Sequence, residues 1–196
     1  MTGVADLLRN ALPQSAATAY PPALPGIDYS AVLVALWNNA GLWQLLFIQR
    51  GEELADHRGQ IAFPGGRKEA EDSGPLQTAL REACEEVGIS AGQTDPLGIL
   101  DPVDTSTGFR IWPVVCILNP PVELTPAPPE VREAFWIPLS WLAEAGRWKW
   151  ETVPSGTGSR GRRAVFFEPY DDHTLWGATA LITVNLLRIL HQGKPS

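Results

Sequence analysis

The residues best suited to chemistry are three neighbouring glutamates, Glu82, Glu85 and Glu86. If this stretch is a helix, Glu82 and Glu86 stand one turn apart with Glu85 beside them, so their carboxylates can converge on one point. Convergent carboxylate oxygens are the ligands that a hard cation such as Mg²⁺ prefers. The same pattern also fits an acidic helix face that is simply solvated.

The electrostatic cost distinguishes these two interpretations. On an exposed helix, like charges one turn apart cost only a few tenths of a kcal/mol. At about 5 Å, with an effective dielectric constant of roughly 20, each enclosed pair would cost about 3 kcal/mol. Enclosed carboxylates would therefore need a cation to offset the repulsion. The spacing alone leaves both interpretations open.

A predicted amphipathic helix must position these glutamates. Asp72 or Ser73 can serve as its N-cap, and Pro75 suits the first turn because its missing N–H would have no partner there. Gly88, just past the last apolar turn, is a natural C-cap. Residues at three- and four-residue steps form one apolar stripe that is expected to face a core. They are Leu76, Ala79, Leu80, Ala83, Cys84 and Val87.

The sequence around this helix resembles the signature box of the Nudix hydrolases. The resemblance rests on Gly66, Asp72 and the run at 81–89, which reads REACEEVGI. It implies an α/β fold, namely an α/β/α sandwich with a mixed β-sheet. It also implies Mg²⁺- or Mn²⁺-dependent cleavage of a nucleoside diphosphate linked to another moiety. Two features depart from the usual box: Asp72 replaces a glutamate, and one extra residue separates it from Arg81.

Those departures resemble one branch of the family, the coenzyme A pyrophosphatases. The run at 57–66, HRGQIAFPGG, is similar to an extra motif of that branch, although Ala55 stands where the branch usually has an arginine. The implied reaction splits coenzyme A or a derivative into 4′-phosphopantetheine and adenosine 3′,5′-bisphosphate. Ala55 keeps open a hydrolase that acts on an ADP-sugar or a dinucleotide. A non-catalytic, ligand-sensing Nudix domain is a further alternative, against which the intact box argues.

The resemblance also implies metal and catalytic roles. The expected metal ligands are the three glutamates and a box glycine carbonyl: Glu82, Glu85, Glu86 and Gly66. The general base is Glu82 or Glu130, and Glu133 is a less favoured acid from the same region. Arg81 is expected to orient a box carboxylate, although it could simply form an i,i+4 pair with Glu85.

Substrate contacts are expected from glycines, arginines and one aromatic residue. They are Arg58, Gly65, Gly66, Phe109 and Arg110, with Arg160, Arg162 and Arg163 as further candidates for binding phosphate. Gly65 and Gly66 form either an ordinary turn or a backbone that approaches a ligand closely. Phe109 could stack on adenine, whereas core packing is favoured for Trp112. His57 is expected to fix its loop rather than to transfer protons.

Composition limits the class of protein. With 196 residues, 44% of them hydrophobic, and a mean hydropathy of −0.06, the chain suits a soluble domain with a sizeable core. A net charge of −7 argues against a general nucleic-acid or membrane-surface binder, but not against a small nucleotide substrate. Cys84 and Cys116 fit reduced core thiols, which suit the cytoplasm.

No run reaches the roughly 20 apolar residues of a membrane span. A homodimer remains open.

The expected division is an N-terminal arm at 1–26, comprising a short helix and a proline-rich tether, and a hydrolase domain at 27–196. A hairpin is predicted from Tyr29–Trp37 and Leu42–Gln49. Pro113 indicates an edge position or a bulge for its strand. Further strands are predicted at Leu97–Val103, Phe109–Leu118, Ala134–Ile137 and Ala164–Glu168, and helices at Leu139–Ala145 and Leu175–His191. Strands and helices mixed in this way favour a mixed sheet between helices.

Overall fold

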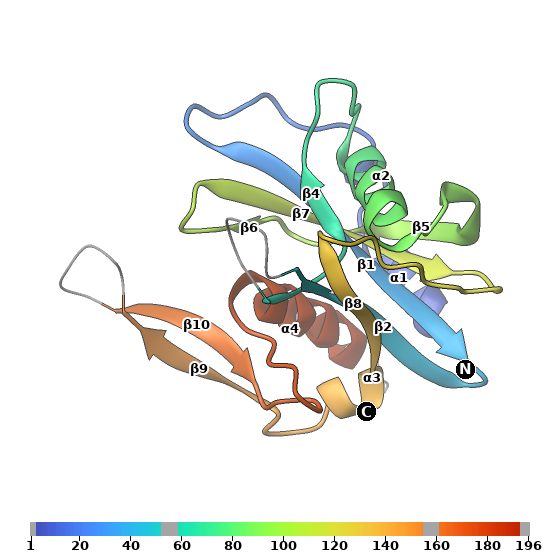
Figure 1. Cartoon of the computed structure of the whole chain (residues 1–196), viewed down its shortest axis with the longest axis vertical. Coiled ribbons are helices and arrows are strands. Elements are labelled where there is room, and N and C mark those ends of the chain that lie inside the picture. The colour runs from blue at the N-terminus through green and yellow to red at the C-terminus, as the bar shows by residue number, and fades with distance from the viewer. Residues whose placement is uncertain (1–2, 52–58, 155–160, 193–196) are drawn as a thin grey trace.

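A computed structural model describes residues 3–51, 59–154 and 161–192 (Figure 1). Its central strand is β1 (Asp28–Asn39), which forms the predicted antiparallel hairpin with β2 (Leu42–Arg50). Side chains of β1 alternate between two buried clusters, with Leu33 in one and Val34 in the other. This alternation explains the nearly continuous apolar sequence, because a strand covered on both faces has no solvated side.

The main sheet is mixed, as predicted. Its path runs β3-β2-β1-β7-β5, while β4 pairs with β1, β6 with β7 and β8 with β2. The β1–β7 pair is parallel and the other pairs are antiparallel. The remaining strands are β3 (Ile61–Ala62), β4 (Gly65–Arg67), β5 (Thr94–Ile99), β6 (Val103–Asp104), β7 (Phe109–Leu118) and β8 (Val131–Pro138).

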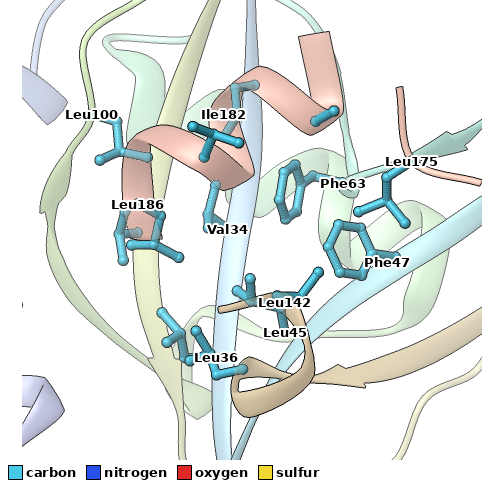
Figure 2. Packing of buried hydrophobic residues seen from close by; sticks show 14 of the residues in the cluster. Val34, Leu36, Leu45, Phe47, Phe63, Leu100, Leu142, Leu175, Ile182 and Leu186 are labelled. Atoms are coloured by element: carbon cyan, nitrogen blue, oxygen red, sulfur yellow. The ribbon is translucent and has the colours of Figure 1, made fainter. Parts of the chain in front are cut away.

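Helices cover both faces of this sheet, which confirms the α/β/α sandwich. Helix α2 (Pro75–Val87) packs against β1 through Ala79, Ala83 and Val87. On the other face, α4 (Gly177–Gln192) and the short α3 (Leu139–Leu142) contribute Ile182, Leu186 and Leu142 to the cluster shown in Figure 2. Within the described residues, none of the helices combines the length and apolar character needed to cross a bilayer.

The N-terminal arm packs on the domain. Helix α1 (Val4–Ala11) lies against α4 and β5, and its Leu8 is fully buried in the same cluster as Ile182. A short 3₁₀ helix, η1 (Ser15–Ala17), follows and buries Ala17 on the opposite face of the sheet. The prolines that indicated a tether therefore belong to a segment that is fixed at several points.

The strands differ from the predictions in three respects. The segment Leu97–Val103 is divided between β5 and β6. Strand β7 is not at an edge, because β1 lies on one side of it and β5 and β6 lie on the other. The carbonyl of Pro113 accepts a hydrogen bond from the N–H of Leu100, but proline has no N–H to return one. The register changes from Ile99↔Val114 in β5 to Val103↔Ile111 in β6, so the bulge alternative for Pro113 fits and only the edge position is wrong.

The third difference concerns a separate hairpin beside α4. Strand β9 (Trp148–Val153), which was not predicted, pairs with β10 (Arg162–Phe167), as Figure 1 shows. All residues of β9 are partly or fully exposed. Its sequence nevertheless begins with apolar–polar alternation, Trp148, Lys149, Trp150 and Glu151, so the signal for a strand was present and was missed.

Candidate active site

Helix α2 has the ends predicted from its sequence but a different N-cap. Pro75 occupies the first turn and Gly88 caps the C-terminus in the left-handed conformation, with φ of 75°. The N-cap residue is Gly74, which makes no side-chain cap, so the N-cap role predicted for Asp72 or Ser73 is wrong. Asp72 instead lies inside the molecule, 4% exposed, and accepts hydrogen bonds from three other groups.

The buried side of α2 includes a glutamate. Glu86 is 3% exposed, whereas Cys84, which was placed on the apolar stripe, is exposed. The helix is therefore rotated about its axis relative to the prediction, so that the row through Ala79, Ala83 and Val87 faces the sheet and Glu86 flanks it. This rotation places one carboxylate of the box beneath the surface.

Two basic or polar groups approach the Glu86 carboxylate. The backbone N–H of Gly65 donates to Oε2 at 2.8 Å, and Arg50 Nη1 lies 3.8 Å from Oε1. The pKa of Glu86 is nevertheless raised to about 7: burial is the main cause and the negative charges of Glu82 and Glu130 contribute, while Gly65 and Arg50 oppose the rise. A buried anion with so little compensation would gain from a cation nearby.

The absence of a side chain at Gly66 leaves room for the carboxylate of Glu82. A Cβ atom at Gly66 would lie 2.3–2.5 Å from the carboxylate atoms of Glu82, closer than any side chain tolerates. Strand β4 can therefore run directly over this carboxylate only because residue 66 is glycine. The two glycines form a strand paired with β1, so the ordinary-turn alternative is wrong, and the approach of this backbone to a ligand stays a prediction. Burial raises the pKa of Glu82, although Arg81 opposes the shift.

Arg81 connects the acidic residues of the box. Its Nη2 donates to Asp72 Oδ2 at 3.0 Å, and its Nη1 donates to Glu82 Oε1 at 2.9 Å and to Glu85 Oε2 at 3.4 Å. Burial alone would raise the pKa of Asp72, but hydrogen bonds from Arg81, the Glu69 N–H and Thr78 together hold it below its usual range. Arg81 thus contacts both Glu82 and Glu85, and its role in orienting a box carboxylate for the reaction stays a prediction.

The three glutamates lie along one side of α2 without converging. Glu85 keeps 58% of its side chain exposed, and across the described ranges no three His, Cys, Asp or Glu side chains lie close enough to hold a metal ion. The chemical types of these residues still suit a divalent cation, because all the donor atoms are oxygens. The buried charge of Glu86 has few opposite charges near it, and Gly66 has no side chain that would block the backbone from lying close to Glu82. The roles of Glu82, Glu85, Glu86 and the Gly66 carbonyl as ligands stay predictions.

Of the two acids downstream of the box, only Glu130 lies close to its carboxylates. Its charge raises the pKa of both Glu82 and Glu86, and its carbonyl accepts a hydrogen bond from the Gly51 N–H at 2.8 Å. Glu133 instead lies 3.4 Å from His173 Nε2. The sequence preference for Glu130 as the additional acid is consistent with this placement.

The predicted substrate residues are more scattered. Ala55, His57, Arg58 and Arg160 lie outside the described residues. Arg110 forms a bidentate pair with Asp104 at 2.6 and 2.8 Å, which occupies the fork predicted to bind phosphate. Phe109 lies under the guanidinium of Arg67, at 4.7 Å from the ring centre, and Trp112 packs edge-on against Tyr20 and Tyr29. Arg162 contacts Ser106 and Arg163 lies over Trp150, all outside the box.

Sequence reasoning missed Arg50 as a site residue. It is the last residue of β2, and its Nε atom is buried without a hydrogen-bond partner among the described residues. A register shift between Gln49 and Arg50 marks this end of the strand. The available signal was strand alternation, because Leu46 and Ile48 face α2 and position 50 continues that side.

The pKa of Glu86 makes the stability of the metal-free protein depend on pH. The pKa rises from its usual 4.5 to about 7 on folding, so the folded state binds the extra proton between these values. Stability therefore falls as pH rises through this window, by up to about 3 kcal/mol. Urea titrations with EDTA at about pH 5 and about pH 8 should show this loss in the unaltered protein but not in Glu86→Gln. An equal loss in both proteins would contradict the assignment.

The two cysteines should differ in reactivity. Cys84 is exposed, while burial raises the pKa of Cys116, so an aromatic disulfide reagent should modify only Cys84 in the folded protein. Because Cys84 contributes little packing, Cys84→Ala should change the free energy of unfolding by at most ~1 kcal/mol and leave turnover nearly unchanged. A folded but inactive Cys84→Ala protein would reveal a thiol mechanism instead.

Comparisons with known proteins agree on one family. A family model described as the NUDIX domain matches residues 29–155. A Yersinia enterocolitica protein named "Uncharacterized Nudix hydrolase NudL" is 38% identical over 138 residues, which cover 70% of this chain and 69% of the relative. A protein of the same name from Salmonella paratyphi B is 38% identical over 147 residues, covering 74% and 72%. The crystal structure of a MutT protein from Methanosarcina mazei Go1 has a TM-score of 0.53 and 19% identity, covers 88% of this chain and 100% of that one, and supports the fold.

Proposed function

The chain belongs to the Nudix hydrolase family, whose members cleave diphosphate bonds, and we propose that this member cleaves the diphosphate of coenzyme A or one of its derivatives. The products would be 4′-phosphopantetheine and adenosine 3′,5′-bisphosphate. The run at 57–66 supports this choice. It resembles the extra motif of the coenzyme A pyrophosphatases, and its last residues, Gly65 and Gly66, adjoin Glu86 and Glu82.

Nudix hydrolases generally need a divalent ion such as Mg²⁺ or Mn²⁺. Glu82, Glu85, Glu86 and the Gly66 carbonyl would hold it, and when bound it supplies charge stabilisation for the diphosphate and a lower pKa for water. The protein's own residues do the rest. The Gly65 N–H fixes the orientation of the Glu86 carboxylate, and Arg81 fixes that of Glu82. Glu82 or Glu130 would accept the proton of the attacking water.

A second candidate keeps the reaction and changes the substrate. Ala55 stands where the coenzyme A branch usually has an arginine, so an ADP-sugar or a dinucleotide is the alternative.

The two cysteines are free, and the exposure of Cys84 suits a reducing compartment, so we also propose a cytoplasmic location.

A substrate panel tests this proposal. Coenzyme A carries a 3′-phosphate that 3′-dephospho-coenzyme A and ADP-sugars lack, and a charge-assisted contact to it is worth roughly 1.5–3 kcal/mol. Coenzyme A should therefore exceed 3′-dephospho-coenzyme A by about 10- to 150-fold in kcat/KM. Arg58→Ala should remove this difference, and Arg162→Ala and Arg163→Ala are the next variants to compare.

The panel is run with Mg²⁺ and with Mn²⁺, and the products of each compound are identified. Equal rates for coenzyme A and its 3′-dephospho form would remove the basis for a 3′-phosphate contact. Faster cleavage of an ADP-sugar or a dinucleotide than of either would favour the alternative substrate class.

A further inference from the structure

The N-terminal arm makes close backbone contact with the start of α2. A Cβ atom at Gly74, the N-cap of α2, would lie 2.4 Å from the carbonyl oxygen of Thr18. Only glycine at position 74 allows the arm to lie this near. Two tyrosines then fix the next part of the arm: Tyr29 donates to the carbonyl of Pro22, and Tyr20 reaches into α2.

The contact of Tyr20 starts a chain of hydrogen bonds that ends at the box carboxylates. Tyr20 Oη donates to Thr78 Oγ1 at 2.8 Å, and Thr78 Oγ1 donates to Asp72 Oδ2 at 2.9 Å. Asp72 accepts from Arg81 at 3.0 Å, and Arg81 in turn donates to Glu82 at 2.9 Å. Residues from the arm, the box loop and α2 are thus joined in one continuous path.

The direction of these bonds follows from the chemistry of the groups. A threonine hydroxyl has one hydrogen, and Thr78 is fully buried, so a bond donated to Asp72 leaves only its lone pairs for Tyr20. A tyrosine phenol is protonated at neutral pH and can donate, and burial raises the pKa of Tyr20 further from neutrality, to about 12. Without that donor, the Thr78 hydroxyl is free to rotate and bond a backbone carbonyl of its own helix, as threonine does in helices.

We propose that Tyr20 and Thr78 are positioning residues through which the N-terminal arm holds Arg81, and with it the Glu82 carboxylate, in the orientation needed for hydrolysis. Asp72 joins the two halves of this hydrogen-bond network, because it accepts a bond from Thr78 and another from Arg81. The inference rests on the diphosphate hydrolysis of the family and not on coenzyme A as the substrate. It gives the arm a direct part in activity in addition to covering the core.

The test compares Tyr20→Phe with Tyr29→Phe. Each removes one phenolic hydroxyl from the contact between arm and domain and keeps the ring, but only Tyr20 belongs to the chain that leads to Asp72. With the panel compound that the unaltered enzyme cleaves fastest, Tyr20→Phe should lower kcat about 5-fold, the size of one neutral hydrogen bond, with KM within about 2-fold. Tyr29→Phe should leave kcat within about 2-fold of the unaltered enzyme.

Thr78 supplies a second pair of variants. Thr78→Val removes the hydroxyl at nearly constant shape and should lower kcat about 10- to 30-fold, while Thr78→Ser should restore it to within about 2-fold. The Arg81 Nε–H signal in ¹⁵N NMR should exchange with water faster in Tyr20→Phe and Thr78→Val, but not in Tyr29→Phe or Thr78→Ser.

Two results would overturn the proposal. One is a Tyr20→Phe enzyme with unaltered kcat and an unaltered Arg81 signal. The other is an equal loss of kcat in Tyr20→Phe and Tyr29→Phe, which would mean that the arm acts only by general attachment. A failure of the coenzyme A proposal would appear in the substrate panel and would leave both comparisons intact.

Discussion

Replacing Glu86 with glutamine is expected to lower kcat by at least ~100-fold in saturating Mg²⁺, because the change removes the charge of a proposed metal ligand and keeps the size of the side chain. The Gly65 N–H can still donate to the amide oxygen, so the local backbone should stay in place. Steady-state assays of the purified variant measure the effect. Glu71→Gln, a change at an exposed acid in the loop before α2, is the control and should retain activity.

The same variant should be at least as stable as the unaltered protein when EDTA is present at about pH 8. Glu86 is buried and its pKa is raised to about 7, so at pH 8 the carboxylate is mostly ionised. This buried charge destabilises the metal-free fold, and glutamine removes it. Thermal unfolding should therefore give an equal or higher melting temperature. Retained activity in saturating Mg²⁺ would rule out Glu86 as a ligand.

Replacing Gly66 with alanine should abolish most activity while leaving the protein folded, with a fall in kcat of about 100-fold. The new methyl group would lie 2.3–2.5 Å from the carboxylate atoms of Glu82, so that carboxylate has to move. Because this carboxylate is the end of a flexible side chain, the shift should misplace the proposed catalytic group of Glu82 without breaking the core. Circular dichroism and a melting temperature within a few degrees of the unaltered protein would document the fold.

Gly92→Ala is the matched control for this change. A Cβ atom at Gly92 would have nothing within 4 Å, and this variant should keep kcat within about 2-fold. Gly65→Ala is unsuitable for the comparison, because its Cβ atom would lie 2.3 Å from the backbone oxygen of Ala31 and would disturb the sheet. Full activity of Gly66→Ala would show that the position of Glu82 does not limit the reaction.

Local signals in the sequence predicted the box helix and the strands around it well. Pro75, Gly88 and the apolar steps between them act within a few residues, and so do the turn residues of the β1–β2 hairpin. The rotation of α2 was not predictable in this way. Whether Cys84 or Glu86 enters the buried side depends on strand β4, whose Gly65 N–H stabilises the glutamate, and β4 is placed by its pairing with β1.

Local sequence signals were also insufficient to predict the contacts within the candidate active site. Glu130 and the box glutamates are brought together by the return of β8 to β2, and the sequence could suggest this contact only through the family resemblance. Asp72 was interpreted as an N-cap because it precedes a helix, whereas its actual partners, Thr78 and Arg81, lie six and nine residues further along. Local capping rules do not include such partners, since they consider only the first turn.

The packing of α1 against α4 has a consequence for synthesis on the ribosome. Leu8 and Leu186 belong to one buried cluster, although most of the described chain separates them. A nascent chain can form the β1–β2 hairpin early, but this cluster cannot close until residue 186 has left the exit tunnel. Until then α1 has only the cover that β5 supplies, so we expect the part of its apolar side that packs on α4 to stay exposed while the last residues are made.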